Sequence, residues 1–175
     1  MASELTVQTL KGPTSGGNAN KIIIPSGQTL DASNGFTAPA GHVVQCQQYY
    51  NSLTAHVTSG STSFVASGIA KSITPKYSDS LIIIQSNITM AYSTNWMEVR
   101  MYLGGSSMAS TANYQVGYID NGHNNYGPLV FQGQHQATST SALNFEIYYR
   151  TASGATAYIT HLNASAALTL WEIKQ

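Results

Sequence analysis

Residues 95–103 read Asn-Trp-Met-Glu-Val-Arg-Met-Tyr-Leu, a stretch in which apolar side chains recur at every second position. Successive side chains of a β-strand point to opposite faces, so this pattern predicts a strand with one buried and one exposed face. Residues 143–150 alternate in the same way. The two segments together indicate antiparallel strands packed on a core. The apolar face of the first strand consists of Met97, Val99, Met101 and Leu103.

Short runs rich in Val, Ile, Thr and Tyr recur from residue 42 onward, separated by Gly, Asn, Ser and Pro, and no long segment has helical periodicity. The most apolar run lies in residues 80–90, and its uninterrupted Leu81-Ile-Ile-Ile84 predicts a strand covered on both faces. We expect about nine or ten strands, as in a jelly-roll or related antiparallel β-sandwich. They are predicted at residues 42–50 (continued by or paired with 53–58), 63–66, 69–74, 80–90, 95–103, 114–119, 128–134, 143–150, 157–162 and 167–173.

Residues 1–41 differ from the rest of the chain, because turn residues interrupt every apolar stretch. Their apolar residues are too few and too dispersed to close a core. We therefore expect an extended N-terminal arm, covered by the rest of the domain or by neighbouring copies, and a head formed by residues 42–175. A mobile terminus is the alternative, but three exposed isoleucines in a row would favour aggregation. The apolar residues of the arm are Leu5, Val7, Ile22, Ile23, Ile24, Leu30 and Phe36.

The composition excludes several partners. The 175-residue chain has 7 Lys+Arg and 7 Asp+Glu, and its charged fraction is 8%, against about 25% in an ordinary globular domain. A neutral chain has no basic field for nucleic acid and no polybasic patch for a membrane surface. No apolar run approaches the ~18 residues of a spanning helix, and no signal peptide is visible. We expect synthesis in a cytoplasm, no nucleic-acid partner and no membrane insertion.

The charged residues of the predicted strands suggest ion pairs. Glu98, Glu146 and Glu172 lie opposite apolar faces, and Arg100 and Arg150 each share a strand with a glutamate. A glycosidase needs two carboxyl groups facing a cleft, a pairing that the sequence does not exclude, but structural ion pairs are the favoured interpretation. We expect Arg100, Arg150 and Glu172 to lie at contacts between subunits.

Other chemistries have no supporting motif. The five histidines lack the spacing of a metal site, although the sequence does not exclude a site assembled across strands or from one histidine of each copy on a trimer axis. No nucleophile-elbow, Walker A or dinucleotide-binding motif occurs. The single Cys46 cannot form an intramolecular disulfide, and its place in an apolar strand predicts a buried, unreactive thiol. We expect no catalytic residue, no metal and no cofactor.

The 11 tyrosines suggest recognition, since tyrosine offers a rigid amphipathic contact surface. Several tyrosines gather with Asn and His in or beside the turn-rich segment 120–127. Asn and His side chains can hydrogen-bond sugar hydroxyls while Tyr rings stack on the sugar; the alternative is an ordinary solvated loop whose tyrosines pack on the sandwich. The candidate binding residues are Tyr114, Tyr118, His123, Asn124, Asn125 and Tyr126.

Three segments resemble a known family. The opening Ser3-Glu-Leu-Thr-Val-Gln-Thr-Leu10 looks like an attachment segment, and Lys21-Ile-Ile-Ile-Pro-Ser-Gly-Gln-Thr-Leu-Asp31 is similar to a shaft-like segment. Gly41-His-Val-Val-Gln45, Ser72-Ile-Thr-Pro-Lys76 and Leu168-Thr-Leu-Trp-Glu-Ile173 follow in the order of a β-sandwich head. Over nearly its full length the chain resembles short tail-fibre and appendage proteins of tailed bacteriophages, particularly those of marine bacteria and cyanobacteria.

The resemblance implies a homotrimer on the tail or capsid surface of a virion, made in the host cytoplasm, with arms along a shared axis that contact other virion proteins. Packing among copies would cover arms that have no core of their own. It supplies no catalytic residues and no receptor-binding residues. The oligomer-interface candidates are Ile22, Ile23, Ile24, Leu30, Arg100, Arg150 and Glu172.

Four functions follow as hypotheses. The first is a non-enzymatic tail fibre whose trimeric head binds a host surface glycan or protein through three weak sites acting together. The second is a capsid head-fibre or decoration protein with the same fold. A polysaccharide depolymerase is less favoured, because such spikes usually carry a long parallel β-helix for which this chain is too short. A cellular lectin or cytokine-like trimer is disfavoured by the lack of a visible secretion signal.

Overall fold

The computed structural model describes residues 10–19, 21–29, 37–52, 57–92, 96–108, 117–120, 125–160 and 165–175. The chain divides into two compact units, Met1–Thr37 and Ala38–Gln175. The second unit, which we call the head, begins a few residues before the boundary expected at residue 41. Two hydrogen bonds tie its first residues to it: the Ala38 N–H donates to the Tyr77 hydroxyl at 3.3 Å, and the Gly41 N–H donates to the Lys174 carbonyl at 2.7 Å.

The described residues of the first unit form turns, with no helix or strand among them. The Ala19 N–H donates to the Gly16 carbonyl at 3.1 Å, and Gly16 has a φ of 88°, which favours glycine. Gly12 lies against the backbone of Lys21 so closely that an added Cβ would collide with the Lys21 carbonyl. Two stretches of the unit therefore cross at a position that admits only glycine.

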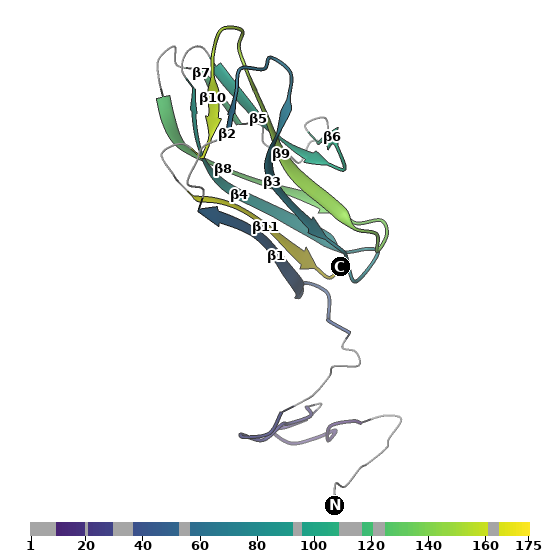
Figure 1. Cartoon of the computed structure of the whole chain (residues 1–175). Helices are drawn as coiled ribbons and strands as arrows, with labels where there is room; N and C mark the ends of the chain where they lie inside the picture. Colours follow the sequence, from purple (N-terminus) through teal and green to yellow (C-terminus); the bar gives the residue numbers. More distant parts are fainter. Residues whose placement is uncertain are drawn as a thin grey trace, which may run out of the picture. The chain divides into compact units, whose positions relative to one another are not determined.

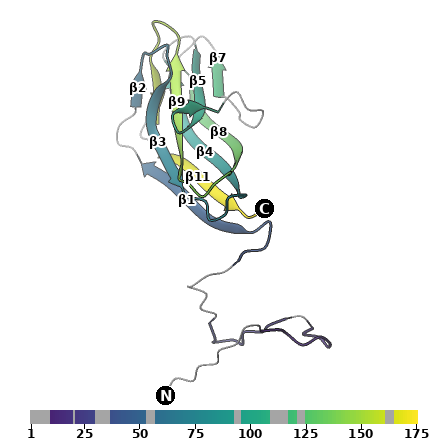
Figure 2. The same ribbon diagram turned by 90° about the vertical axis from the view of Figure 1, so that its right-hand side faces the viewer.

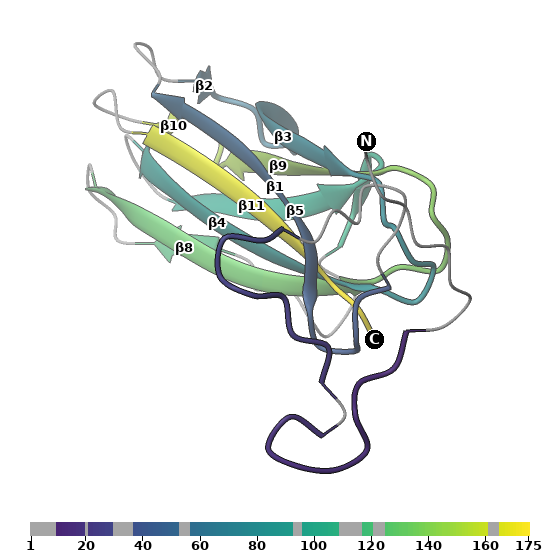
Figure 3. The same cartoon turned by 90° about the horizontal axis from the view of Figure 1, so that it is seen from below.

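The head is all-β in its described residues, and its strands form two antiparallel sheets that face each other (Figures 1 and 3). No described helix is long and apolar enough to span a membrane. The prediction of an all-β fold with packed antiparallel sheets is confirmed. The strands are β1 (Val43–Ser52), β2 (Val57–Ser59), β3 (Val65–Ile73), β4 (Leu81–Tyr92), β5 (Trp96–Leu103), β6 (Ser106–Ser107), β7 (Gly117–Asp120), β8 (Asn125–Gln136), β9 (Leu143–Thr151), β10 (Ala157–Ile159) and β11 (Ser165–Ile173).

The larger sheet has six strands in the order β1-β11-β4-β10-β2, and β8 pairs with β4. Strand β4 is its centre: β8 pairs along its whole length, whereas β11 pairs with Leu81–Asn87 and β10 with Met90–Tyr92. The smaller sheet has five strands in the order β3-β9-β5-β6, and β7 pairs with β5. Figure 2 shows the head from the side of the five-stranded sheet, with β3, β9, β5 and β7 in front.

The core lies between the two sheets, and alternation along the strands builds it. The central inward residues of β5 and β9 are at most 3% exposed, and those of β4 and β11 meet them from the other sheet. The predicted inward faces of β5 and β9 are therefore confirmed for their central residues, while Leu103 and Leu143 are only partly buried. The largest fully buried side chains include Tyr149, Phe145, Ile82, Ile84, Ile88, Met90, Met97 and Ile147.

The expectation that β4 is covered on both faces is wrong within a single chain. Ile82 and Ile84 are buried, but Leu81 and Ile83 are partly exposed on the outer face of the six-stranded sheet. The reason is that only the inner face of this sheet is packed against a second layer, that is, the five-stranded sheet.

Strand β3 combines the two strands predicted at residues 63–66 and 69–74. Its register with β9 shifts between Ala66 and Ala70, which marks a β-bulge. Gly68 within the bulge has a φ of 75°, a conformation that side chains disfavour, and the Ile69 N–H donates to the Ser67 hydroxyl at 3.1 Å. The bulge returns Ile69 and Ile73 to the core face, where both are buried.

Candidate functional site

The outer face of the five-stranded sheet carries a cluster of arginine and aromatic side chains. It arises from the same alternation that fills the core, because the residues between the inward ones point outward. All of its arginine and aromatic members are partly exposed, and Glu98 lies beneath them at 6% exposure. We call this cluster the arginine–aromatic surface; it consists of Phe64, Trp96, Arg100, Tyr102, Tyr148 and Arg150.

Glu98 is held by both arginines of the chain. Arg100, two residues further along β5, directs Nε at 2.7 Å and Nη2 at 2.6 Å to Oε1 of Glu98. Arg150, the register partner of Glu98 on β9, directs Nε at 2.8 Å and Nη2 at 2.6 Å to Oε2. Each carboxylate oxygen thus accepts a forked, charge-assisted pair. The expectation of structural ion pairs is confirmed for Glu98. Arg150 pairs with Glu98 across strands and not with Glu146 of its own strand, and Glu172 is held by neutral donors, as described below.

Aromatic rings surround the two guanidinium groups. The Phe64 ring centroid lies 4.6 Å from Cζ of both Arg100 and Arg150, and the Trp96 ring lies 5.4 Å from Cζ of Arg150. Cations at such distances from an aromatic face are attracted by about 0.5–2 kcal/mol. Tyr102 and Tyr148 stack at 3.9 Å with an interplanar angle of 18°, and their rings extend the aromatic area along the sheet.

The two arginines and Glu98 determine the electrostatics of this cluster. Two guanidinium groups against the one carboxylate of Glu98 give these three side chains a net charge of +1, and Glu146 lies further along the same face of β9. Both oxygens of Glu98 are occupied by arginines, so this carboxylate is not placed to act as a nucleophile or general base. Among the described residues, no group of three or more His, Cys, Asp or Glu side chains lies in an arrangement that could hold a metal ion.

Glu172 occupies a different place from the one expected. It is fully buried, so its carboxylate lies inside its own chain and away from any surface that a second copy could contact. Oε1 accepts hydrogen bonds from the Lys76 N–H at 2.7 Å, the Tyr77 N–H at 3.2 Å and the Ser80 hydroxyl at 2.7 Å; Oε2 accepts one from Gln45 Nε2 at 2.6 Å. Burial raises the pKa of Glu172, but these hydrogen bonds together outweigh burial and hold the pKa below its ordinary value.

The other interface candidates are exposed or lie outside the described residues. Ile22, Ile23 and Ile24 in the first unit are 48%, 56% and 43% exposed, and Leu30 lies outside the described residues. Arg100 and Arg150 are paired within one chain, as described above, and their side chains remain 30% and 33% exposed.

The predicted binding segment is only partly described. Tyr114, His123 and Asn124 lie outside the described residues. Tyr118 is in β7, where its register partner is Glu98. Asn125 and Tyr126 begin β8, opposite Tyr92 and Ala91 of β4. The register therefore places the backbone of Tyr118 next to that of Glu98 in the five-stranded sheet, and it places Asn125 and Tyr126 in the other sheet.

Cys46 is exposed, and the prediction of a buried thiol is wrong. Its register partner is Trp171 on β11, a residue of the outer face of the six-stranded sheet. Because β1 is packed on one face only, alternation places Cys46 on the uncovered side. The thiol is thus on the surface of the single chain.

Sequence reasoning assigned the arginines and Glu98 to ion pairs but missed the aromatic residues around them. The available signal was the spacing of Trp96 and Tyr102 on the polar face of their strand, where exposed aromatic side chains are unusual. Phe64 gave no such signal, because it precedes β3 and meets the arginines only through the folded sheet.

Comparison with known proteins gives little. No family model matches the chain, and no curated protein matches its sequence. A crystal structure of dimeric latent PorU from Porphyromonas gingivalis aligns with 80% of this chain at 10% identity and a TM-score of 0.40. The alignment spans 14% of the PorU chain, and similarity at this level carries no functional argument.

Proposed function

We propose that this chain is a virion structural protein of a bacteriophage, a tail fibre or fibre-like appendage without catalytic activity, whose head binds a glycan or protein of the host cell surface. The phage origin rests on the sequence resemblance described above. The binding role rests on one observation, the partly exposed arginine–aromatic surface on a rigid β-sheet. Arginine and aromatic residues are enriched at recognition surfaces, and a sheet holds them with little loss of conformational entropy on binding.

The strand order supports a jelly-roll head. Without the short strands β2, β6 and β10, the sheets have the orders β1-β11-β4-β8 and β3-β9-β5-β7. Eight antiparallel strands in two sheets, with neighbours far apart in sequence, is the arrangement of a double Greek-key jelly roll. The proposed head is therefore a jelly-roll sandwich.

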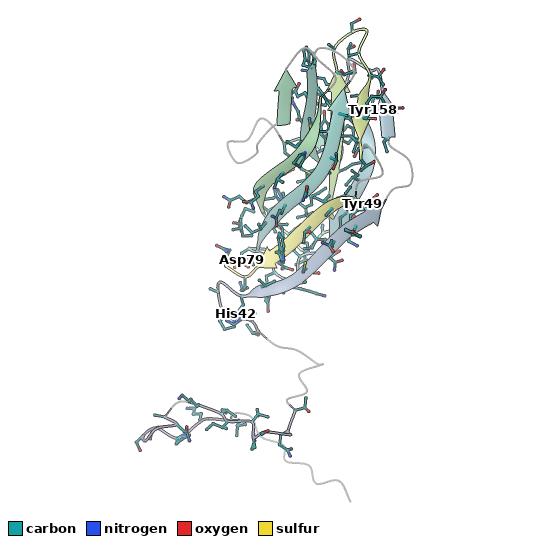
Figure 4. The ribbon with its side chains drawn as sticks, turned by 90° about the vertical axis from the view of Figure 1, so that its left-hand side faces the viewer. His42, Tyr49, Asp79 and Tyr158 are labelled. Atoms are coloured by element: carbon teal, nitrogen blue, oxygen red, sulfur yellow. The ribbon has the colours of Figure 1, made fainter. Side chains whose placement is uncertain are left out.

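The distribution of charge supports a homotrimer. The six strands of the larger sheet contain a single formally charged residue, Glu172, and it is buried. The strongly exposed apolar residues described in the head are Val43, Tyr50 and Val130, all on this sheet. Edge strands of soluble proteins are normally protected by charge, by Lys above all. An uncharged, partly apolar face is protected instead if a second copy covers it. Figure 4 views the head from this side, with Tyr49 on β1 and Tyr158 on β10 labelled.

The outer face of the six-stranded sheet is also hollowed beside β8. An open depression of about 250 Å³ is lined by Ile83, Gln132, Gly133 and Gln134. A side chain of a neighbouring copy fits this depression. We propose that residues 1–41 attach the trimer to other virion proteins, through exposed isoleucines at 22–24.

Labelling of intact particles tests the location. An antibody raised against the full chain should decorate tails if the protein is a tail fibre, and it should decorate capsids if the alternative of a head-fibre or decoration protein holds. A particle that carries no label, in a preparation where the antibody detects the denatured chain in infected cells, would overturn the virion assignment.

Binding is tested separately with the purified full-length protein. Fluorescent protein should adsorb to host cells and reduce phage adsorption in competition. The chain length of the extracted host polysaccharide should stay constant during incubation with the protein; shortened chains would make the protein a depolymerase. Absence of adsorption would contradict the receptor-binding role while leaving a purely structural role in place.

A further inference from the structure

We infer that the arginine–aromatic surface recognises a carboxylated sugar, a residue of the uronic-acid or sialic-acid type. The inference rests on the proposed binding role and adds the chemical class of the ligand. It follows from three properties of the surface: an excess of positive charge, N–H donors directed away from Glu98, and aromatic rings beside those donors.

The first property is charge. Arg100 and Arg150 share Glu98 as their carboxylate, so these three side chains together carry one unmatched positive charge. Glu146, the register partner of Tyr102, lies on the same face of β9, with Tyr148 between it and Arg150. Both guanidinium groups are about one-third exposed. An anion that approaches this face is therefore attracted, whereas a neutral sugar gains nothing from the charge.

The second property is the supply of donors. A guanidinium has five N–H groups in a fixed plane, and each arginine directs its Nε and one side of its Nη2 at Glu98. The remaining N–H groups of Nη1 and Nη2 point away from that carboxylate. Guanidinium groups pair with carboxylates through parallel hydrogen bonds. Glu98 also fixes both planes in advance, so little entropy is lost when a second carboxylate binds.

The third property is the aromatic surround. Phe64 lies against both guanidinium groups and 6.0 Å from the Tyr102 ring, which in turn stacks on Tyr148. Sugar rings have apolar C–H faces that pack on aromatic rings, and a carboxylate on such a sugar would then reach the arginines.

The test compares one sugar with and without its charge. Trigalacturonate and its methyl ester have the same rings and hydroxyls and differ in the carboxylate. We expect the full-length protein to bind trigalacturonate at least ten times more tightly than the methyl ester in calorimetric titration, since a charge-assisted contact is worth roughly tenfold or more. Binding should weaken as salt is raised from about 50 to about 500 mM.

Two variants locate the site. Arg150→Gln removes one cation, and we expect it to lower the affinity for trigalacturonate at least about tenfold. Phe64→Leu removes the aromatic ring without breaking an ion pair, and we expect it to lower that affinity about threefold to tenfold. Lys76→Gln is the matched control, because it removes a cation from the exposed segment between β3 and β4. Melting curves identify variants that fail to fold, and Phe64→Leu keeps the test valid if Arg150→Gln does not fold.

Three outcomes overturn the inference. Equal affinity for the acid and the methyl ester would show a neutral-sugar site and leave the binding role intact. If Lys76→Gln lowers the affinity for trigalacturonate as much as both surface variants do, the ligand binds elsewhere on the protein. If neither sugar binds at millimolar concentration while labelled protein still adsorbs to host cells, the ligand is of another class and the receptor-binding role survives; loss of adsorption as well would overturn both.

Discussion

Replacing Glu172 by Gln tests whether the buried carboxylate stabilises the head. Oε1 accepts three hydrogen bonds, from the backbone of Lys76 and Tyr77 and from the Ser80 hydroxyl, and Oε2 accepts one from Gln45. These donors connect β1, the segment between β3 and β4, and the end of β11. The substitution removes the charge and replaces one acceptor oxygen by an NH₂ group.

The magnitude follows from these four bonds. If the amide oxygen takes the place of Oε1, three bonds persist as neutral ones, which contribute about 1 kcal/mol each against about 1.5–3 kcal/mol for bonds to a charged group. The new NH₂ group then faces Nε2 of Gln45, which is also a donor. These losses are partly offset, because the neutral amide no longer bears the cost of burying a charge, the largest single influence on this carboxyl group. We expect the free energy of unfolding to fall by about 2–3 kcal/mol, which lowers the Tm of a domain of this size by about 4–12 °C.

The effect depends on pH with a defined sign. The pKa of Glu172 in the folded protein is below its ordinary value of 4.5, so the carboxylate stabilises the fold above that value. This contribution is lost as the pH falls through the lower, folded pKa. The difference in Tm between the wild-type protein and Glu172→Gln should therefore be largest at neutral pH and should become smaller below pH 4.5.

Thermal unfolding followed by circular dichroism at about pH 7 and about pH 3 measures both effects. Glu146→Gln is the matched control, because it makes the same change on the partly exposed outer face of β9; its free energy of unfolding should change by less than about 0.5 kcal/mol. Equal Tm values for the two variants would refute a stabilising role of the Glu172 carboxylate. So would a Tm difference between the wild-type protein and Glu172→Gln that does not change with pH.

Four further predictions concern the bulge, His135, the outer face of the six-stranded sheet and Cys46. Gly68→Ala places a Cβ at a φ of 75°, where space is open but the backbone is strained, and should lower stability by about 1–2 kcal/mol in a urea titration; no change would argue against the bulge. Burial lowers the pKa of His135 in the folded protein, so the unfolded chain takes up the proton at a higher pH than the folded chain does. The free energy of unfolding should therefore fall as the pH drops below 6.5. His135→Gln should remove this decline in thermal unfolding measured between about pH 7.5 and about pH 5. Ile83→Lys charges the outer face of the six-stranded sheet and should convert a mass of about three chains to one in light scattering, whereas Ser72→Lys on the other sheet should not; a wild-type monomer would contradict the trimer. Cys46, on the same face as Ile83, should react with a thiol reagent faster in Ile83→Lys than in the wild type if that face is covered.

Local periodicity predicted the core well. The alternating positions around Val99 and Ile147 are buried as expected, because a two-residue period determines the face of a residue without knowledge of its neighbours. The same rule misplaced Cys46, since it assigns a residue to a face but does not tell which face of an edge strand is covered.

Contacts between residues far apart in the sequence could not be predicted from the local pattern. The partners of Glu172 come from residues 45 and 76–80, and nothing in the local pattern of β11 indicates that they meet. Phe64 reaches Arg100 and Arg150 from the segment before β3. The ion pair within β5 was predictable because Glu98 and Arg100 are two residues apart on one face, whereas the pair with Arg150 depends on the β5–β9 register.

The nearly uncharged six-stranded sheet has a consequence for the solvents that the protein tolerates. Dissolved ions shorten the range over which exposed charges act, whereas buried groups are screened much less. Since the six strands contain one formally charged side chain, and that one is shielded from solvent, charge screening at about 0.5 M sodium chloride should change the melting temperature little, whereas a kosmotropic salt should raise it by strengthening apolar burial. Binding of an acidic ligand to the five-stranded sheet should weaken over the same titration. A single salt series therefore distinguishes the stability of the head, which depends little on charge, from its ligand affinity, which depends on charge.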